Sequence, residues 1–123
     1  MASQKRILVV DDEFFLVEML KDRLEFTGYV VDSAENGADA LKLLQEKPFD
    51  LVIMDVMMPV MDGIQATRII KGHEKLKKIP VLFLTARARP EDEIEGRKAG
   101  ADDYLAKPFD MDDLISLVKK WVK

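Results

Sequence analysis

Five short stretches of the chain have the pattern of β-strands, and three of them are almost wholly apolar. Strands that are buried on both faces of a parallel sheet form such continuous apolar runs. The three apolar stretches are residues 5–10, 51–54 and 79–84, and the two more polar ones are residues 29–34 and 102–106. We therefore predict three central strands and two edge strands.

Between these stretches, apolar residues recur at the three- and four-residue spacing of amphipathic helices. Gly28, Pro48 and Gly100 stand where three of these segments should end, because glycine and proline terminate helices. Asp110 and Asp113 resemble a capping box at the start of the last segment. The predicted helices carry Leu16, Leu20 and Leu24, then Ala40, Leu41 and Leu44, then Ala66, Ile69 and Ile70 within 64–71, then the polar segment 91–99, and finally Leu114, Leu117, Val118 and Trp121 within 110–122.

Strands that alternate with helices predict a parallel sheet covered on both faces and wound by right-handed crossovers. The two more polar strands, at 29–34 and 102–106, belong at the edges, which corresponds to the strand order 2-1-3-4-5. The predicted fold is therefore α/β, a single doubly wound (βα)5 domain over residues 1–123, with a five-stranded parallel sheet and helices on both faces.

Composition narrows the classes of function. The chain has 123 residues, a formal net charge of -4 and no cysteine. Without a dominant basic face, nucleic acid is not expected as a direct partner. Disulfides and thiolate metal sites are excluded, and no apolar run approaches the roughly 18 residues of a membrane span. We expect a cytoplasmic protein with no membrane partner.

Polar residues follow the strands of the predicted sheet, and the carboxyl ends of parallel strands gather at one rim. That rim would collect Asp11, Asp12, Asp55, Thr85 and Lys107. Three carboxylates repel one another unless a cation is present, and the lysine offsets only one charge. Mg²⁺ prefers such hard oxygen ligands and would bring the formal charge to zero, with Mn²⁺ as an alternative.

A carboxylate beside a divalent cation and an ammonium can attack a phosphoryl group. Asp55, at the end of the central strand, is the candidate nucleophile. Asp12 is the better direct metal ligand, and Asp11 is the second member of the acid pair. Lys107 would contact a phosphoryl oxygen as a point charge, and the Thr85 hydroxyl could bond another.

These residues belong to a series of short motifs along the chain. Through these motifs the chain resembles the receiver domain of two-component response regulators. The resemblance, of the chemotaxis-Y-like kind, runs from the first strand to the last helix. The motifs are Asp11-Asp12, Val52-Ile53-Met54-Asp55, Met58-Pro59, Asp62-Gly63, Leu84-Thr85-Ala86, Ala99-Gly100-Ala101-Asp102-Asp103-Tyr104 and Lys107-Pro108-Phe109.

The resemblance implies that Asp55 accepts a phosphoryl group from the phosphohistidine of a sensor histidine kinase or a phosphotransfer domain. It implies that Mg²⁺ is bound by Asp12, Asp55 and the backbone carbonyl of Met57. Such a chain is a phosphoacceptor switch that catalyses its own phosphoryl transfer and autodephosphorylation, not an enzyme with a separate substrate. Met57 and Arg87 occupy positions where the family varies and tunes the lifetime of the phosphoryl group.

The resemblance also implies that Thr85 and Tyr104 change rotamer together and that the Lys107–Pro108 peptide bond is cis. When Thr85 turns toward the phosphoryl group, Tyr104 is placed to fill the space. We hypothesise that residues 91–122 then present a changed surface to a downstream protein, a fused output domain or a second copy in a phosphorylation-dependent homodimer.

Simpler interpretations of single residues stay open. Asp11 and Asp12 could cap the first helix, Lys107 could be a surface lysine, Thr85 could cap a loop, and Tyr104 could be an edge-strand aromatic without a switching role. His73 is expected to be incidental. The methionines at 54, 57, 58 and 61 are expected to pack in the core and loops, and residues 91–95 to form a solvated helix face.

Three other functions compete with the receiver hypothesis. A carboxylate-nucleophile phosphatase usually needs a second acid two residues after the nucleophile, where this chain has Met57. A nucleotide- or flavin-binding domain needs a glycine-rich loop after the first strand, where Asp11-Asp12-Glu13 would repel phosphate. A degenerate receiver used only for binding would not need the complete set of acids, threonine and lysine.

Overall fold

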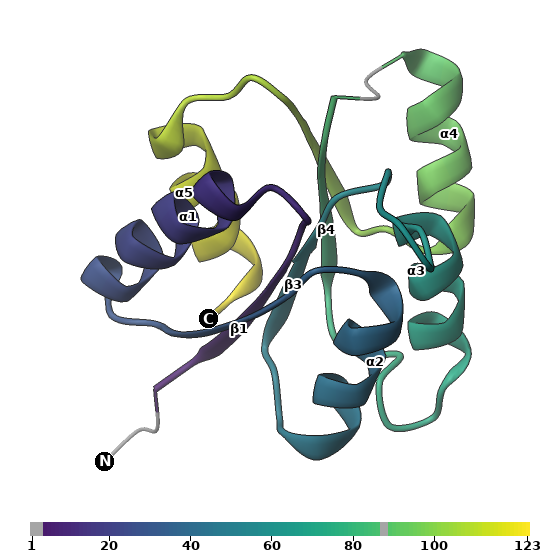
Figure 1. Ribbon diagram of the computed structural model, residues 1–123, viewed down its shortest axis with the longest axis horizontal. Helices are drawn as coiled ribbons and strands as arrows, with labels where there is room; N and C mark the ends of the chain where they lie inside the picture. Colours follow the sequence, from purple (N-terminus) through teal and green to yellow (C-terminus); the bar gives the residue numbers. More distant parts are fainter. Residues whose placement is uncertain (1–3, 87–88) are drawn as a thin grey trace.

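The computed structural model describes residues 4–86 and 89–123. At its centre lies a five-stranded parallel sheet in the order β2-β1-β3-β4-β5 (Figure 1). This order is the predicted one, with the two polar strands at the edges. The strands are β1 (Arg6–Val10), β2 (Val30–Ala34), β3 (Leu51–Met54), β4 (Val81–Thr85) and β5 (Asp103–Ala106).

Helices cover both faces of the sheet, as the alternating pattern predicted (Figure 1). One face carries α1 (Phe14–Thr27) and α5 (Met111–Trp121). The other carries α2 (Gly37–Glu46), α3 (Gly63–Gly72) and α4 (Pro90–Ala99). No helix among the described residues is long and apolar enough to cross a membrane.

Two hydrophobic cores lie on opposite faces of the sheet, and successive strand residues alternate between them. In β1, Ile7 and Val9 pack in the core under α1 and α5, while Leu8 and Val10 pack in the core under α2, α3 and α4. This alternation follows from the two-residue period of a strand. Because both faces are covered, every position of a central strand must be apolar, which explains the uninterrupted runs in the sequence.

The register of the central strands brings their carboxyl ends level. Val10 lies beside Met54, and Met54 lies beside Phe83. At the edge, Thr85 lies beside Ala106. The residues that follow β1, β3 and β5 therefore meet the end of β4 at one rim.

The edge strands carry charged residues that are held by neighbouring side chains. Asp32 in β2 is paired with Arg6 at 2.9 Å and with Lys47 at 3.7 Å. Asp103 in β5 accepts a hydrogen bond of 2.8 Å from the Trp121 indole N–H and lies 3.6 Å from the Lys120 ammonium. Both edges thus present fixed carboxylates.

Several local predictions are corrected. The last helix begins after Asp110, but the side chain of Asp110 makes no capping hydrogen bond, so the predicted capping box is not formed. β4 begins after Pro80, because proline lacks the N–H that a central strand must donate. In the segment 91–95, Asp92 is buried and paired with Arg89 at 3.5 Å, whereas its acidic neighbours are exposed.

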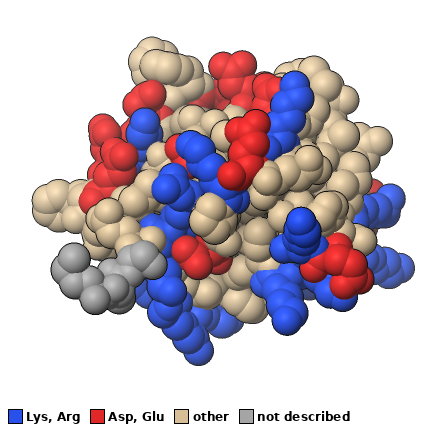
Figure 2. All heavy atoms as spheres, turned by 90° about the horizontal axis from the view of Figure 1, so that it is seen from below, with Lys and Arg blue, Asp and Glu red and all other residues tan. Residues whose placement is uncertain are grey.

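In α4 and α5, acidic residues lie in the first turn and basic residues in the last. α4 begins with Glu91, Asp92 and Glu93 and ends with Arg97 and Lys98, which matches the helix dipole. α5 follows the same pattern, with acids in its first turn and Lys119 and Lys120 in its last. On the face seen in Figure 2, Lys and Arg are interspersed with Asp and Glu. That face offers no broad surface of a single sign for nucleic acid.

Candidate functional site

Asp55 directly follows β3, and its carboxylate is held at the rim by a well-fixed backbone. Its N–H donates to the Val10 carbonyl at 3.0 Å, so the chain is still aligned with β1. Asp55 as a whole is 6% exposed. A side chain at Gly63 would overlap the Asp55 carbonyl oxygen, so the loop can return this close only with glycine. This explains the Asp62-Gly63 motif.

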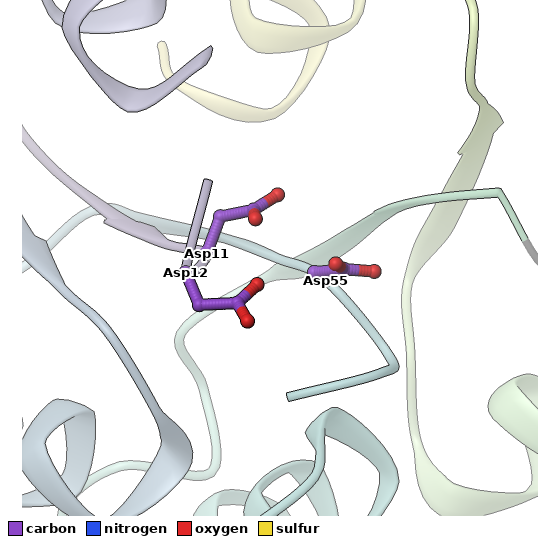
Figure 3. A group of neighbouring side chains, drawn as sticks. All are labelled: Asp11, Asp12 and Asp55. Carbon is purple, nitrogen blue, oxygen red and sulfur yellow. The ribbon is translucent and has the colours of Figure 1, made fainter. Parts of the chain in front are cut away.

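Asp11 and Asp12 leave the end of β1 beside Asp55. Figure 3 shows the three carboxylates projecting to the same side of the rim, and each offers an oxygen within 4.8 Å of the others. Asp11 is 3% exposed, whereas Asp12 is exposed to solvent. Asp11 Oδ1 accepts a 3.0 Å hydrogen bond from the Glu13 N–H, and Glu13 occupies the N-cap position of α1. Asp11 and Asp12 therefore precede the N-cap residue of α1, and their carboxylates lie near that of Asp55.

Lys107 reaches this group from the loop after β5. Its ammonium donates to Asp11 Oδ2 at 2.8 Å and lies 3.5 Å from Asp55 Oδ2. It also donates to Glu13 Oε1 at 3.2 Å. The Lys107–Pro108 peptide bond is cis, which confirms the expectation from the family resemblance. Glu13 was not predicted to belong to the site, although its position next to the acid pair was an available signal.

The electrostatic state of the site follows from these contacts. Burial raises the pKa of the Asp55 carboxyl above its usual value, and the charge of Asp11 raises it further; Lys107, Thr85 and the Met57 N–H act in the opposite direction without cancelling the rise. Burial alone would lower the pKa of the Lys107 ammonium, but Asp11, Asp55 and Glu13 outweigh it and the net shift is upward. The lysine is thus held firmly in its charged form.

Thr85 and Tyr104 connect the rim to the surface of α4. Thr85 ends β4, is 1% exposed and hydrogen-bonds the Asp55 carboxylate. The partly buried ring of Tyr104 meets Phe83 edge to face, with centroids 6.1 Å apart. Gly96 of α4 lies so close that an added Cβ would stand 2.8 Å from the Phe83 ring and 3.7 Å from that of Tyr104. Thr85 therefore contacts Asp55, and Tyr104 lies beside α4.

The arrangement suits a divalent cation. Three converging carboxylates supply hard oxygen ligands, and Asp12 adjoins an open hollow of about 390 Å³ that Met57 and Asp62 also line. Such a hollow leaves room for the water ligands that Mg²⁺ retains. The Met57 carbonyl as a ligand stays a prediction. The Met57 side chain is 61% exposed, unlike the buried Met54, and Arg87 lies outside the described residues.

A doubly wound sheet with an acid triad, a lysine and a hydroxyl at its carboxyl rim defines the class of phosphoacceptor signalling domains. The response regulator receiver domain family matches residues 7–119. The chain belongs to this family and is a receiver domain of the two-component response regulator type.

Known relatives agree with this assignment. The response regulator MprA of a Mycobacterium species is 41% identical over 114 residues, which are 93% of this chain and 49% of MprA. A crystal structure of a putative response regulator from Chloroflexus aurantiacus superimposes with a TM-score of 0.92 at 37% identity and covers 98% of each chain. The chain spans about half the length of the curated relatives that it matches.

One solved relative bears on the metal. The receiver domain of a sensor histidine kinase from Pseudomonas aeruginosa has a magnesium ion coordinated in its active-site cleft. It superimposes with a TM-score of 0.90 at 32% identity and covers 98% of each chain. The acid cluster described above is consistent with divalent-metal binding in this family.

Proposed function

We propose that Asp55 is the phosphoacceptor of this receiver domain and takes its phosphoryl group from a phosphohistidine on a sensor kinase or phosphotransfer domain. The observation that carries the proposal is the convergence of Asp11, Asp12 and Asp55 within 4.8 Å, with the Lys107 ammonium 3.5 Å from Asp55. The surrounding acids and lysine match what in-line phosphoryl transfer requires, which is mainly positioning and charge neutralisation.

In the proposed reaction, an Asp55 carboxylate oxygen attacks phosphorus as the P–N bond breaks, and the bonding pair returns to the imidazole of the donor. The Lys107 ammonium balances charge on one phosphoryl oxygen, and the Thr85 hydroxyl turns its hydrogen bond from Asp55 to another. Mg²⁺, or Mn²⁺ in its place, held by Asp11, Asp12, Asp55 and the Met57 carbonyl, would neutralise the remaining phosphoryl charge.

The test is labelling with a small phosphodonor. Wild-type protein incubated with acetyl phosphate and Mg²⁺ should gain one phosphoryl group, seen by intact mass, that base or hydroxylamine removes. Chelation of the metal should prevent the gain. Asp55→Asn should lose it, whereas Asp50→Asn should keep it, because Asp50 lies at the other end of β3 and accepts a hydrogen bond from the Arg6 N–H. A stable ester on serine or threonine would contradict the proposal.

Phosphorylation should alter the surface over residues 91–122. Thr85 contacts Asp55, and Tyr104 packs against Phe83 beside Gly96 of α4, so a movement of Thr85 has a short path to that helix. This surface is the proposed contact for a downstream protein, a fused output domain or a second copy. A partner must prefer the phosphorylated state, since only differential affinity shifts the populations.

Amide hydrogen exchange, with and without beryllofluoride as a phosphoryl mimic, tests this switch. We expect changed exchange in the loops around Asp55 and also in α4, β5 and α5. Thr85→Ala should still accept the phosphoryl group but show a smaller change at Tyr104. A response confined to the Asp55 loops, with residues 91–122 unaffected, would refute the switching surface.

The biological setting belongs to the same proposal. The protein acts as a phosphorylation switch that carries out its own transfer and autodephosphorylation, not as an enzyme that turns over a separate substrate. The proposed location is the cytoplasm, because a histidine kinase takes the phosphoryl group that it passes on from ATP.

A further inference from the structure

Among the described residues, the Lys107 ammonium has one carboxylate partner outside the acid triad, Glu13. Glu13 Oε1 accepts its hydrogen bond at 3.2 Å, although Glu13 is mostly exposed and its side chain makes no capping bond to α1. Asp11 accepts a second bond from the same ammonium at 2.8 Å, and Asp55 lies slightly further away at 3.5 Å. The ammonium is therefore drawn toward the start of α1 and away from Asp55.

We propose that Glu13 is a positioning residue that restrains Lys107 before phosphorylation and thereby slows phosphoryl transfer to Asp55. This inference rests on the proposed function of Asp55. A phosphoryl group on Asp55 needs the ammonium as a counter-charge, and turning toward it weakens the contact with Glu13.

Glu13 and Asp11 differ in how easily they release the lysine. The Asp11 carboxylate is buried and is itself fixed by the Glu13 N–H at 3.0 Å. The Glu13 side chain is 61% exposed in its pair with Lys107, so water replaces the contact at little cost. The restraint is consequently weak, and its removal should raise the phosphorylation rate by only about two- to five-fold, the range of an exposed ion pair.

Three variants distinguish an effect of the Glu13–Lys107 contact from an effect of the Glu13 charge. Glu13→Gln removes the charge, and Glu13→Asp keeps the charge but shortens the side chain by one methylene. Glu18→Gln is the control, because Glu18 is an exposed acid further along α1 with no ion pair to Lys107 among the described contacts. The first readout is the rate of acetyl phosphate labelling at saturating Mg²⁺, followed by intact mass.

The second readout needs neither metal nor phosphodonor. Acetylation of Lys107 by an N-hydroxysuccinimide ester, measured by peptide mass spectrometry in chelated protein, reports how firmly the amine is held. We expect both Glu13 variants to label Lys107 about two-fold faster and to phosphorylate faster than wild type, with Glu18→Gln unchanged in both assays.

Two results would overturn the inference. Glu13→Asp behaving as wild type while Glu13→Gln is faster would assign the effect to charge alone. Unchanged Lys107 acetylation in both Glu13 variants would show that Glu13 does not restrain the lysine. A failure of Asp55 itself is distinguishable, since wild type would then not be phosphorylated, while the acetylation assay would still report on the Glu13–Lys107 contact.

Discussion

At Asp55, the proposed phosphoacceptor, the surroundings of the carboxylate oppose the folded state. Burial and the charge of Asp11 raise its pKa, so the ionised form is less favourable in the folded protein than in the unfolded chain. Lys107 offsets part of this cost from 3.5 Å. Stability is therefore lower because of the residue that we propose accepts the phosphoryl group.

We predict that Asp55→Asn unfolds at higher urea concentration than wild type at pH 7, with a gain of about 1 kcal/mol, as relief at strained functional sites commonly gives. Because the pKa of Asp55 is higher in the folded protein than in the unfolded chain, lowering the pH stabilises wild type relative to Asp55→Asn. The gain should vanish below the unfolded value near 3.8. Asp22→Asn, at an exposed position of α1, is the control and should show no comparable gain. A less stable Asp55→Asn would contradict the argument.

At the scale of elements, α4 packs against the sheet through small side chains. Its buried residues are Asp92, Gly96 and Ala99, while Ile94 is 56% exposed. The helix therefore lies close to β4 and β5 with little apolar area to hold it there. Few apolar contacts hold this helix, which suits the surface that we propose changes on phosphorylation.

Gly96→Ala tests this close approach. Alanine would gain about 1 kcal/mol of helix propensity, but its Cβ would stand 2.8 Å from the Phe83 ring. Crowding in a packed core costs about 1–3 kcal/mol, so we expect a net loss of stability in urea unfolding. Gly72→Ala, where nothing lies within 4 Å of an added Cβ, should be neutral or stabilising. A stabilised Gly96→Ala would show that α4 can lift from the sheet freely.

At the scale of the whole molecule, the sequence predicted the sheet order and the gathering of site residues because both depend on strands. A strand covered on both faces must be largely apolar, and the first polar residue after it marks the rim; Asp11 and Asp55 were found in this way. Burial of Asp92 was not predictable, because the inward face of α4 is made of small residues that leave no apolar period.

The contact between Glu13 and Lys107 was missed for a different reason. It joins residues separated by 94 positions, and either one alone has the character of a surface charge. The capping box at Asp110 failed because a capping sequence permits the hydrogen bond without requiring it. Family resemblance added the cis bond before Pro108, which no residue pattern implied.

The charged edge strands have a consequence for how the protein behaves in crowded solution. An unpaired strand edge can recruit a strand from another chain, and residues 7–10, 51–54 and 81–84 of the central strands form apolar, uncharged runs of the kind that stacks into fibrils. Asp32 and Asp103 place a negative charge on each of the two edge strands. Burial alone would raise the pKa of Asp103, but hydrogen bonds from Trp121 and Tyr104 and the charge of Lys120 lower it. The Asp103 carboxylate therefore stays ionised in mild acid. The charge on each edge strand therefore disfavours the addition of further strands, and the apolar central strands stay covered by helices while the domain is folded.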